Sequence, residues 1–172
     1  MPRRTTELHL GEFYHVYNRG ANRSPIFFTR ENYLFFLQRL REKVACDTAT
    51  IVCWCLLLNH YHLLVHIESD QFSSAMQAFG TSYSKAINKQ QDRTGTLFEG
   101  RFQAKHVDEE NYLRYLSRYI HLNPSAAKLA ASPASWEFSS YPDYIGERSG
   151  TLATKDIILQ EFQSVLRYRE FV

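Results

Sequence analysis

The segment His60-Tyr61-His62 carries the side chains best suited to hold a metal ion. It lies in a β-rich apolar stretch, and alternate residues of a strand point to the same face, so the two imidazoles are expected side by side. Imidazole nitrogen is a common ligand of divalent ions. A bare His-x-His pair is also compatible with two half-exposed strand histidines that bind water. The pair alone therefore does not establish a metal site.

A second polar feature lies on the predicted helix that precedes Pro124. Spacings of 3, 4 and 4 place four residues on one helical stripe, Tyr112, Tyr115, Tyr119 and Asn123. The neighbouring stripe is apolar and is the natural core face, with Leu113, Leu116 and Ile120. The stripe of three tyrosines and Asn123 is compatible with a purely structural position at the edge of the core. It is equally compatible with a phenolic nucleophile at Tyr119, with the amide oxygen of Asn123 one turn away as a metal ligand.

Five motifs occur in order along the chain, and together they are more specific than any one of them. They are Val16-Tyr17-Asn18-Arg19-Gly20, His60-Tyr61-His62, Gly95-Thr96-Leu97-Phe98-Glu99-Gly100-Arg101-Phe102, Arg118-Tyr119-Ile120-His121-Leu122-Asn123-Pro124 and Trp136-Glu137-Phe138-Ser139-Ser140-Tyr141. In this combination the sequence resembles the REP-associated tyrosine transposases, which belong to the single-tyrosine HUH transposases. The resemblance extends from about residue 13 to residue 145.

The resemblance implies an enzyme that cleaves and rejoins single-stranded DNA through a 5′-phosphotyrosine intermediate. It assigns the nucleophile to Tyr119 and the metal ligands to His60, His62 and Asn123. Mixed imidazole and amide-oxygen ligands suit Mn²⁺ and accept Mg²⁺, so the expected cofactor is one of these two ions. The metal would polarise the scissile phosphate as a Lewis acid.

The resemblance also implies a DNA partner, a short hairpin beside a single-stranded tag. Twenty basic against eighteen acidic residues give a net charge of only +2, which does not favour general duplex binding. Basic residues are nevertheless concentrated in residues 1–41 and 83–106. The predicted DNA contacts are Asn18, Arg19, Arg23, Arg101 and Lys105, each of which is also compatible with an ordinary surface position.

The elements that must position these residues follow from periodicity. Strands are predicted at residues 9–18, 51–58, 61–67 and 101–106, and helices at 29–45, 70–88, 108–122 and 154–166, with Asn123-Pro124 ending the third helix. This order predicts an α+β fold, a ferredoxin-like βαββαβ antiparallel sheet with helices on one face, plus the nucleophile helix and a C-terminal extension. Residues 1–124 are expected to form the catalytic domain, with residues 125–172 packed on it.

Composition limits the class of protein. A chain of 172 residues with 44% hydrophobic and 22% charged residues is typical of one globular domain. The longest apolar run, Ile51–Leu58, is too short to span a bilayer, and residues 1–6 lead into no secretory h-region. Cys46, Cys53 and Cys55 lack metal-type spacing and are expected to be buried, reduced thiols. A cytoplasmic protein without a membrane partner is therefore expected.

Two rival functions remain at this stage. One is a DNA-binding protein that derives from a transposase and has lost catalysis, although the presence of His60, His62, Tyr119 and Asn123 argues against it. The other is a replication initiator or relaxase, which usually belongs to a larger multidomain chain. Both a monomer and a homodimer are compatible with the sequence, because some dimeric relatives place the tyrosine helix of one subunit in the active site of the other.

Overall fold

The computed structural model describes residues 6–172, and for Glu110 and Asn111 only the backbone. Ten helices and strands follow one another along this part of the chain. They are β1 (Phe13–Arg19), α1 (Arg30–Leu40), β2 (Ala49–Leu56), β3 (His60–Ile67), α2 (Phe72–Gln90), β4 (Gln103–Val107), α3 (Glu110–Ala126), α4 (Tyr141–Tyr144), α5 (Asp156–Leu159) and α6 (Val165–Phe171). Short 3₁₀ turns lie at Ala21–Arg23 and Pro133–Ser135, and a π-helical turn at Arg41–Ala45 extends α1.

The four strands form one antiparallel sheet in the order β2-β3-β1-β4. This order, with α1 between β1 and β2 and α2 between β3 and β4, confirms the predicted ferredoxin-like βαββαβ arrangement. The pairing register places Tyr17 opposite His62 and Arg19 opposite His60. On the other side of β1, His15 lies opposite Lys105. The register therefore gathers residues from β1, β3 and β4 at one place on the sheet.

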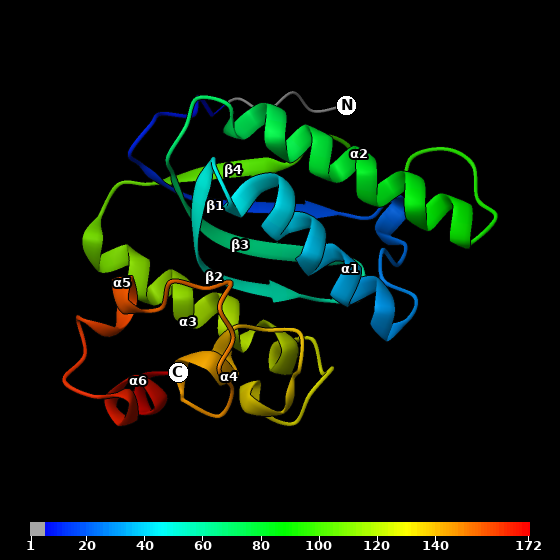
Figure 1. The fold of residues 1–172 in the computed structure, drawn as a ribbon. Helices are drawn as coiled ribbons and strands as arrows, with labels where there is room; N and C mark the ends of the chain where they lie inside the picture. The colour runs from blue at the N-terminus through cyan, green and yellow to red at the C-terminus, as the bar shows by residue number, and fades with distance from the viewer. Residues whose placement is uncertain (1–5) are drawn as a thin grey trace.

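Two cores lie on the two faces of the sheet (Figure 1). The helices α1 and α2 cover one face, because their apolar sides pack against the odd-numbered residues of β3, among them Tyr61 and Leu63. On the other face, α3 and the C-terminal helices pack against Leu64 and the two buried cysteines of β2. Residues beyond Pro124 reach this second core through Tyr141, Tyr144, Ile158 and Tyr168.

Several boundaries differ from the predicted ones. Pro124 lies inside α3, which ends at Ala126, and not at the end of the helix as predicted. A proline in the last turn removes only one backbone hydrogen bond, so the helix continues for two more residues. The prediction of one helix at 154–166 is wrong, because two separate short helices, α5 and α6, form there. The Ser164 hydroxyl accepts a hydrogen bond from the Arg167 amide and starts α6 as a separate helix.

Two smaller expectations also need correction. β1 begins at Phe13, later than the predicted residue 9, because a turn through Gly11 in the left-handed region (φ +80°) precedes it. Cys53 and Cys55 are buried as predicted, but Cys46 is exposed, because it follows the π-helical turn at the surface.

Candidate functional site

β3 presents His60 and His62 toward α3, on the face opposite Tyr61. The strand alternates, so the two imidazoles lie side by side as predicted, with ring centroids 5.0 Å apart and perpendicular planes. His62 is buried, with 7% of its surface exposed, whereas His60 is half-buried at the rim. The pair therefore spans the boundary between the second core and solvent.

A third histidine, which the sequence analysis did not include, belongs to the same cluster. His15 on β1 is buried, and its Nε2 atom lies 2.9 Å from the Nδ1 atom of His62. The two rings stack with centroids 5.1 Å apart. In the sequence, the alternation of His15 with Tyr17 indicates only that the two side chains share a strand face. It does not reveal the contact between His15 and His62, because the register between β1 and β3 is fixed only in the folded sheet.

α3 carries the polar stripe past this cluster. Tyr112, Tyr115 and Tyr119 are about half exposed, whereas the residues of the neighbouring stripe, Leu113, Leu116 and Ile120, are buried, so both predicted stripes exist. The Tyr119 ring lies 5.7 Å from the ring of His62 and 6.1 Å from that of His15, in both cases edge-on. Tyr115 instead contacts Phe171 of α6 at 5.5 Å. Of these tyrosines, Tyr119 is the one that lies beside the histidines.

Asn123 lies one turn beyond Tyr119 on α3. Its Nδ2 atom donates a 2.8 Å hydrogen bond to the Tyr119 carbonyl oxygen, which links the amide to the turn that carries the tyrosine. The amide oxygen, which is the atom predicted to bind a metal, is not used in this bond.

The site histidines favour the neutral form. Burial, followed by the charges of His15 and His60, lowers the pKa of His62 to about 3. Burial and the charge of Lys105 lower the pKa of His15 to about 4. Burial and then the charge of Arg19 lower the pKa of His60. A neutral imidazole offers a nitrogen lone pair to a metal ion, so these shifts suit ligand chemistry at neutral pH.

The hydrogen bonds of the two strand histidines indicate which nitrogen carries that lone pair. The Nδ1 atom of His60 lies 2.7 Å from Oδ1 of Asn59, and an amide oxygen only accepts, so Nδ1 carries the hydrogen and Nε2 the lone pair. The Nδ1 atom of His62 lies 2.9 Å from Nε2 of His15, and which of these two nitrogens donates depends on the tautomers. When His62 donates, its Nε2 atom carries the lone pair. Such partners orient metal-ligating histidines in many proteins.

Among the side chains that the structure describes, no group of three or more His, Cys, Asp or Glu is arranged to hold a metal ion. A ligand set drawn from these four residue types is therefore not formed. The set predicted from the sequence combines two histidines with an amide, donors that suit an ion with mixed nitrogen and oxygen ligands. His60 and His62 line one cavity, whereas Asn123 is not part of its lining, so Asn123 as the third ligand stays a prediction.

A cavity of about 600 Å³ opens in front of the histidines, and we call it the tyrosine pocket. Its lining includes His60, His62 and Tyr119. The end of β1 and the turn after it add Tyr17, Asn18, Arg19 and Arg23, the loop 95–102 adds Glu99, Gly100 and Arg101, and Asn59 and Gln103 lie at the starts of β3 and β4. Four of the five predicted DNA contacts therefore border this pocket. The fifth, Lys105, lies outside the lining, with its ammonium 6.0 Å from the Tyr17 ring.

Two of the predicted DNA contacts also hold the loop 95–102 against β1. The Asn18 amide donates to the Gly100 carbonyl at 3.0 Å, and its oxygen accepts from the Arg19 backbone at 2.9 Å. The Arg19 guanidinium pairs with Glu99 at 2.7 Å. Asn18 and Arg19 therefore have structural partners, while Arg23 and Arg101 are exposed at the rim. Contact of these residues with DNA stays a prediction.

The fold and this arrangement of strand histidines and helix tyrosine agree with the class of protein that the sequence resembles. Residues 12–123 match the model of the family described as IS200-like transposases. The chain belongs to this family.

A solved structure of a REP-associated tyrosine transposase bound to a REP hairpin is similar to this chain, with a TM-score of 0.67 and 16% identity over 85% of this chain and 86% of that one. At this identity the likeness shows the fold. A comparison with curated protein sequences gives no match. None of the helices formed by residues 6–172 is long and apolar enough to cross a membrane.

Proposed function

We propose that this protein cleaves and rejoins single-stranded DNA, with Tyr119 as the nucleophile. The observation that carries the proposal is the position of the Tyr119 ring, edge-on to His62 at 5.7 Å and at the mouth of a pocket bordered by arginines. A half-exposed phenol beside neutral histidines is accessible to a backbone phosphate. Membership of the IS200-like transposase family supports the same reaction class.

In the proposed reaction the Tyr119 oxygen attacks a DNA phosphorus and the 3′-oxygen leaves in line. The phenol loses its proton, the departing oxygen gains one, and the DNA 5′-phosphate becomes a phosphotyrosine ester. Attack by another 3′-hydroxyl reverses the step, so one phosphoester bond is exchanged for another. Since the α3 backbone fixes Tyr119 beside His62 of the same chain, we propose that the tyrosine acts within its own subunit.

His60, His62 and Asn123 are proposed to hold one Mg²⁺ or Mn²⁺ ion. When bound, the ion supplies Lewis-acid polarisation of the scissile phosphate. The role of the protein is to orient the ligands: Asn59 fixes the His60 ring at 2.7 Å, and His15 fixes the His62 ring at 2.9 Å. The link between Asn123 and the Tyr119 carbonyl couples the third ligand to the nucleophile turn.

The substrate is proposed to be hairpin-forming single-stranded DNA. Arg23 and Arg101 are exposed at the rim of the tyrosine pocket and can meet backbone phosphates, whereas Arg19 and Asn18 shape the rim through Glu99 and Gly100. Lys105 would extend the positive surface along β4. The similar solved structure is a transposase bound to a hairpin, which supports this choice of substrate.

The test is formation of a covalent protein–DNA adduct. A labelled hairpin with single-stranded flanks, taken from the genomic neighbourhood of the gene, is incubated with the protein and Mn²⁺, and the adduct is mapped by peptide mass spectrometry. Tyr119→Phe should eliminate the adduct. Tyr115→Phe, which removes the same atom one turn earlier, should leave it intact. Binding of the hairpin without any adduct would favour the non-catalytic DNA-binding alternative, and an adduct at Tyr115 would contradict the assignment of the nucleophile.

A further inference from the structure

An ion pair borders the tyrosine pocket, between Arg19 at the end of β1 and Glu99 of the loop 95–102. The Nε and Nη2 atoms of Arg19 lie 2.9 and 2.7 Å from the same carboxylate oxygen, Oε2 of Glu99. The two side chains are 42% and 50% exposed. An ion pair this exposed contributes little to the stability of a fold, so its main effect is on the charge and geometry of the pocket that it borders.

The register of the sheet places Arg19 beside His60. The two residues lie directly opposite each other on β1 and β3, so their side chains leave the same face of the sheet with Cβ atoms roughly 4.5–5.5 Å apart. Burial, and then the positive charge of Arg19, lower the pKa of His60, which agrees with a guanidinium that acts on this part of the site. The cation therefore adjoins a proposed metal ligand, with Glu99 as its partner.

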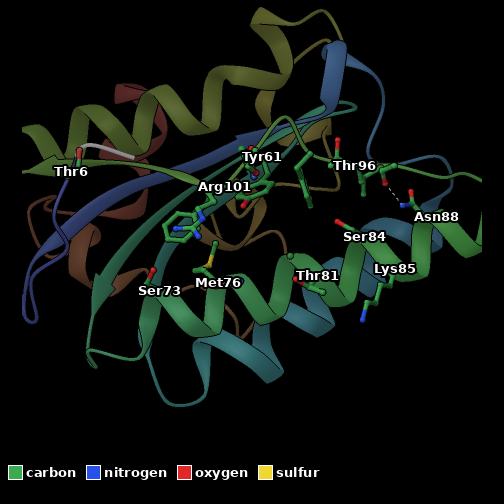
Figure 2. Close-up of a pocket in the computed structure, with 18 of the residues that line it drawn as sticks. Thr6, Tyr61, Ser73, Met76, Thr81, Ser84, Lys85, Asn88, Thr96 and Arg101 are labelled. Carbon is green, nitrogen blue, oxygen red and sulfur yellow. Dashed lines mark hydrogen bonds between the residues drawn. The ribbon is translucent and has the colours of Figure 1, made fainter. Parts of the chain in front are cut away.

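The loop that carries Glu99 is fixed to β1 by hydrogen bonds. A cavity of about 780 Å³ lies between this loop and α2 (Figure 2). On the side of the sheet, the Glu99 backbone amide donates to the Arg19 carbonyl at 2.9 Å, and Asn18 donates to the Gly100 carbonyl at 3.0 Å. Arg19 and Glu99 are therefore joined through both backbone and side chains, which limits the positions that the guanidinium adopts.

Arg19 differs in this respect from the other cations of the pocket. Arg23 and Arg101 also line it, but both are exposed and neither forms an ion pair within the described part of the chain. The Nη1 atom of Arg19 forms no hydrogen bond among the described residues, so it is available to a phosphate oxygen. Because Glu99 already orients its guanidinium, Arg19 loses less conformational freedom on binding a phosphate than a free arginine does.

We propose that Arg19 is a catalytic residue, which stabilises the negative charge that develops on the scissile phosphate, and that Glu99 is the positioning residue that orients it. This inference rests on the proposed function, because it takes the scissile phosphate to lie between His60 and Tyr119. A cation that is fixed in advance stabilises developing charge without reorganisation at the moment of reaction. The guanidinium keeps its proton throughout, so the proton balance of the proposed reaction is unchanged.

The experiment separates DNA binding from the chemical step. Loss of a contact made equally before and during the reaction weakens affinity, whereas loss of transition-state stabilisation lowers the rate of the bound complex. The rate is that of single-turnover adduct formation with Mn²⁺ at saturating protein, on a labelled hairpin with single-stranded flanks. Affinity is measured by fluorescence anisotropy in the Tyr119→Phe background. Arg19→Gln should lower the rate by about 100-fold and change hairpin affinity by no more than a few-fold.

Two further variants test the orienting role of Glu99. Arg19→Lys keeps the charge but loses the planar fork, so it should restore only part of the rate. Glu99→Gln should lower the rate by about tenfold, because a misplaced group stabilises the transition state less well. In the Arg19→Gln background the same Glu99→Gln change should have no effect, because Glu99 acts through Arg19. A residue that only supported the loop would lower the rate equally in both backgrounds.

A control variant and thermal unfolding exclude general effects. Lys43→Gln removes one positive charge at an exposed position outside the tyrosine pocket and should change neither rate nor affinity. Thermal unfolding shows which variants are folded, and Arg19→Lys decides the question if Arg19→Gln is not. Wild-type rates at saturation in the folded Arg19 variants would make Arg19 a simple DNA contact, and the proposal would be wrong. Absence of any adduct with the wild-type protein would instead contradict the proposed function.

Discussion

The Nε2 atom of His15 lies 2.9 Å from the Nδ1 atom of His62, across the boundary between β1 and β3. Both rings are buried, and burial keeps both neutral, so one nitrogen donates the shared hydrogen and the other accepts it. If His62 donates, its Nε2 atom carries a lone pair on the side of Tyr119. We therefore expect His15 to be a positioning residue, which acts on the proposed reaction through His62.

Replacement of His15 by phenylalanine should weaken metal binding. The substitution keeps an aromatic ring in the buried position but removes the hydrogen-bond acceptor, so the His62 ring loses its fixed orientation. Removal of such a partner typically weakens metal affinity by about 10–100-fold. Isothermal titration of the DNA-free protein with Mn²⁺ measures the effect. His15→Gln, whose amide oxygen can replace Nε2 as acceptor, should recover most of the affinity, and equal Mn²⁺ affinity in wild type and His15→Phe would exclude the positioning role.

The substitution His62→Ala should abolish DNA cleavage while hairpin affinity changes by no more than a few-fold. His62 is buried behind Tyr119, whereas the arginines proposed to meet DNA lie at the rim of the tyrosine pocket. Cleavage assays with Mn²⁺, with Mg²⁺ and after exhaustive chelation measure DNA cleavage. Fluorescence anisotropy measures hairpin affinity. Cleavage that persists both in His62→Ala and without divalent ions would show that the metal assignment is wrong.

Hairpin or single-stranded DNA should be preferred over blunt random duplex at physiological salt. The net charge is only +2, so the general electrostatic attraction to a duplex is small. Each phosphate contact to a single strand contributes roughly −0.7 to the slope of log K against log salt concentration. Arg23→Gln should therefore reduce the slope by about that amount. Lys43→Gln lowers the net charge equally but lies at an exposed position outside the tyrosine pocket, and it should leave the slope unchanged. Equal binding of duplex and hairpin would argue for a non-specific basic surface.

The sequence predicts the sheet well, because strand and helix periodicities are strong over β2, β3, α2 and α3. Spacing alone also predicts that His60 and His62 share a face and that Tyr119 lies on the stripe of Asn123. The contact between His15 and His62 could not be predicted, because it depends on the register of strands whose residues are 47 positions apart. The cavity between α2 and the loop 95–102 was missed for a related reason (Figure 2). Its far wall is an irregular loop, and periodicity gives no information about where a loop lies.

The last prediction concerns His121, which lies two residues beyond Tyr119 and is fully buried. Its Nδ1 atom lies 2.7 Å from the Tyr168 hydroxyl and its Nε2 atom 2.9 Å from Ser140 Oγ, so this imidazole joins α3 to α6 and to the start of α4. Tyr168 donates onward to Ser117 at 3.0 Å, which leaves its oxygen to accept from His121. A neutral ring satisfies both bonds when Nδ1 donates to Tyr168 and Nε2 accepts from the Ser140 hydroxyl, whose other available acceptor is the Trp54 carbonyl at 3.2 Å.

Burial lowers the pKa of His121 from 6.5 to about 3. Between these two values the unfolded chain binds a proton at this residue and the folded protein does not, so the free energy of unfolding falls as the pH falls below about 6.5. At pH 5 the loss from this residue alone is roughly 1–2 kcal/mol relative to pH 7.5. His121→Gln should lower stability at neutral pH and make its decrease with acid less steep. Urea denaturation between pH 5 and 7.5 measures both effects, with His9→Gln at an exposed position as the control. An unchanged pH dependence in His121→Gln would show that this histidine is not the neutral link between α3 and α6.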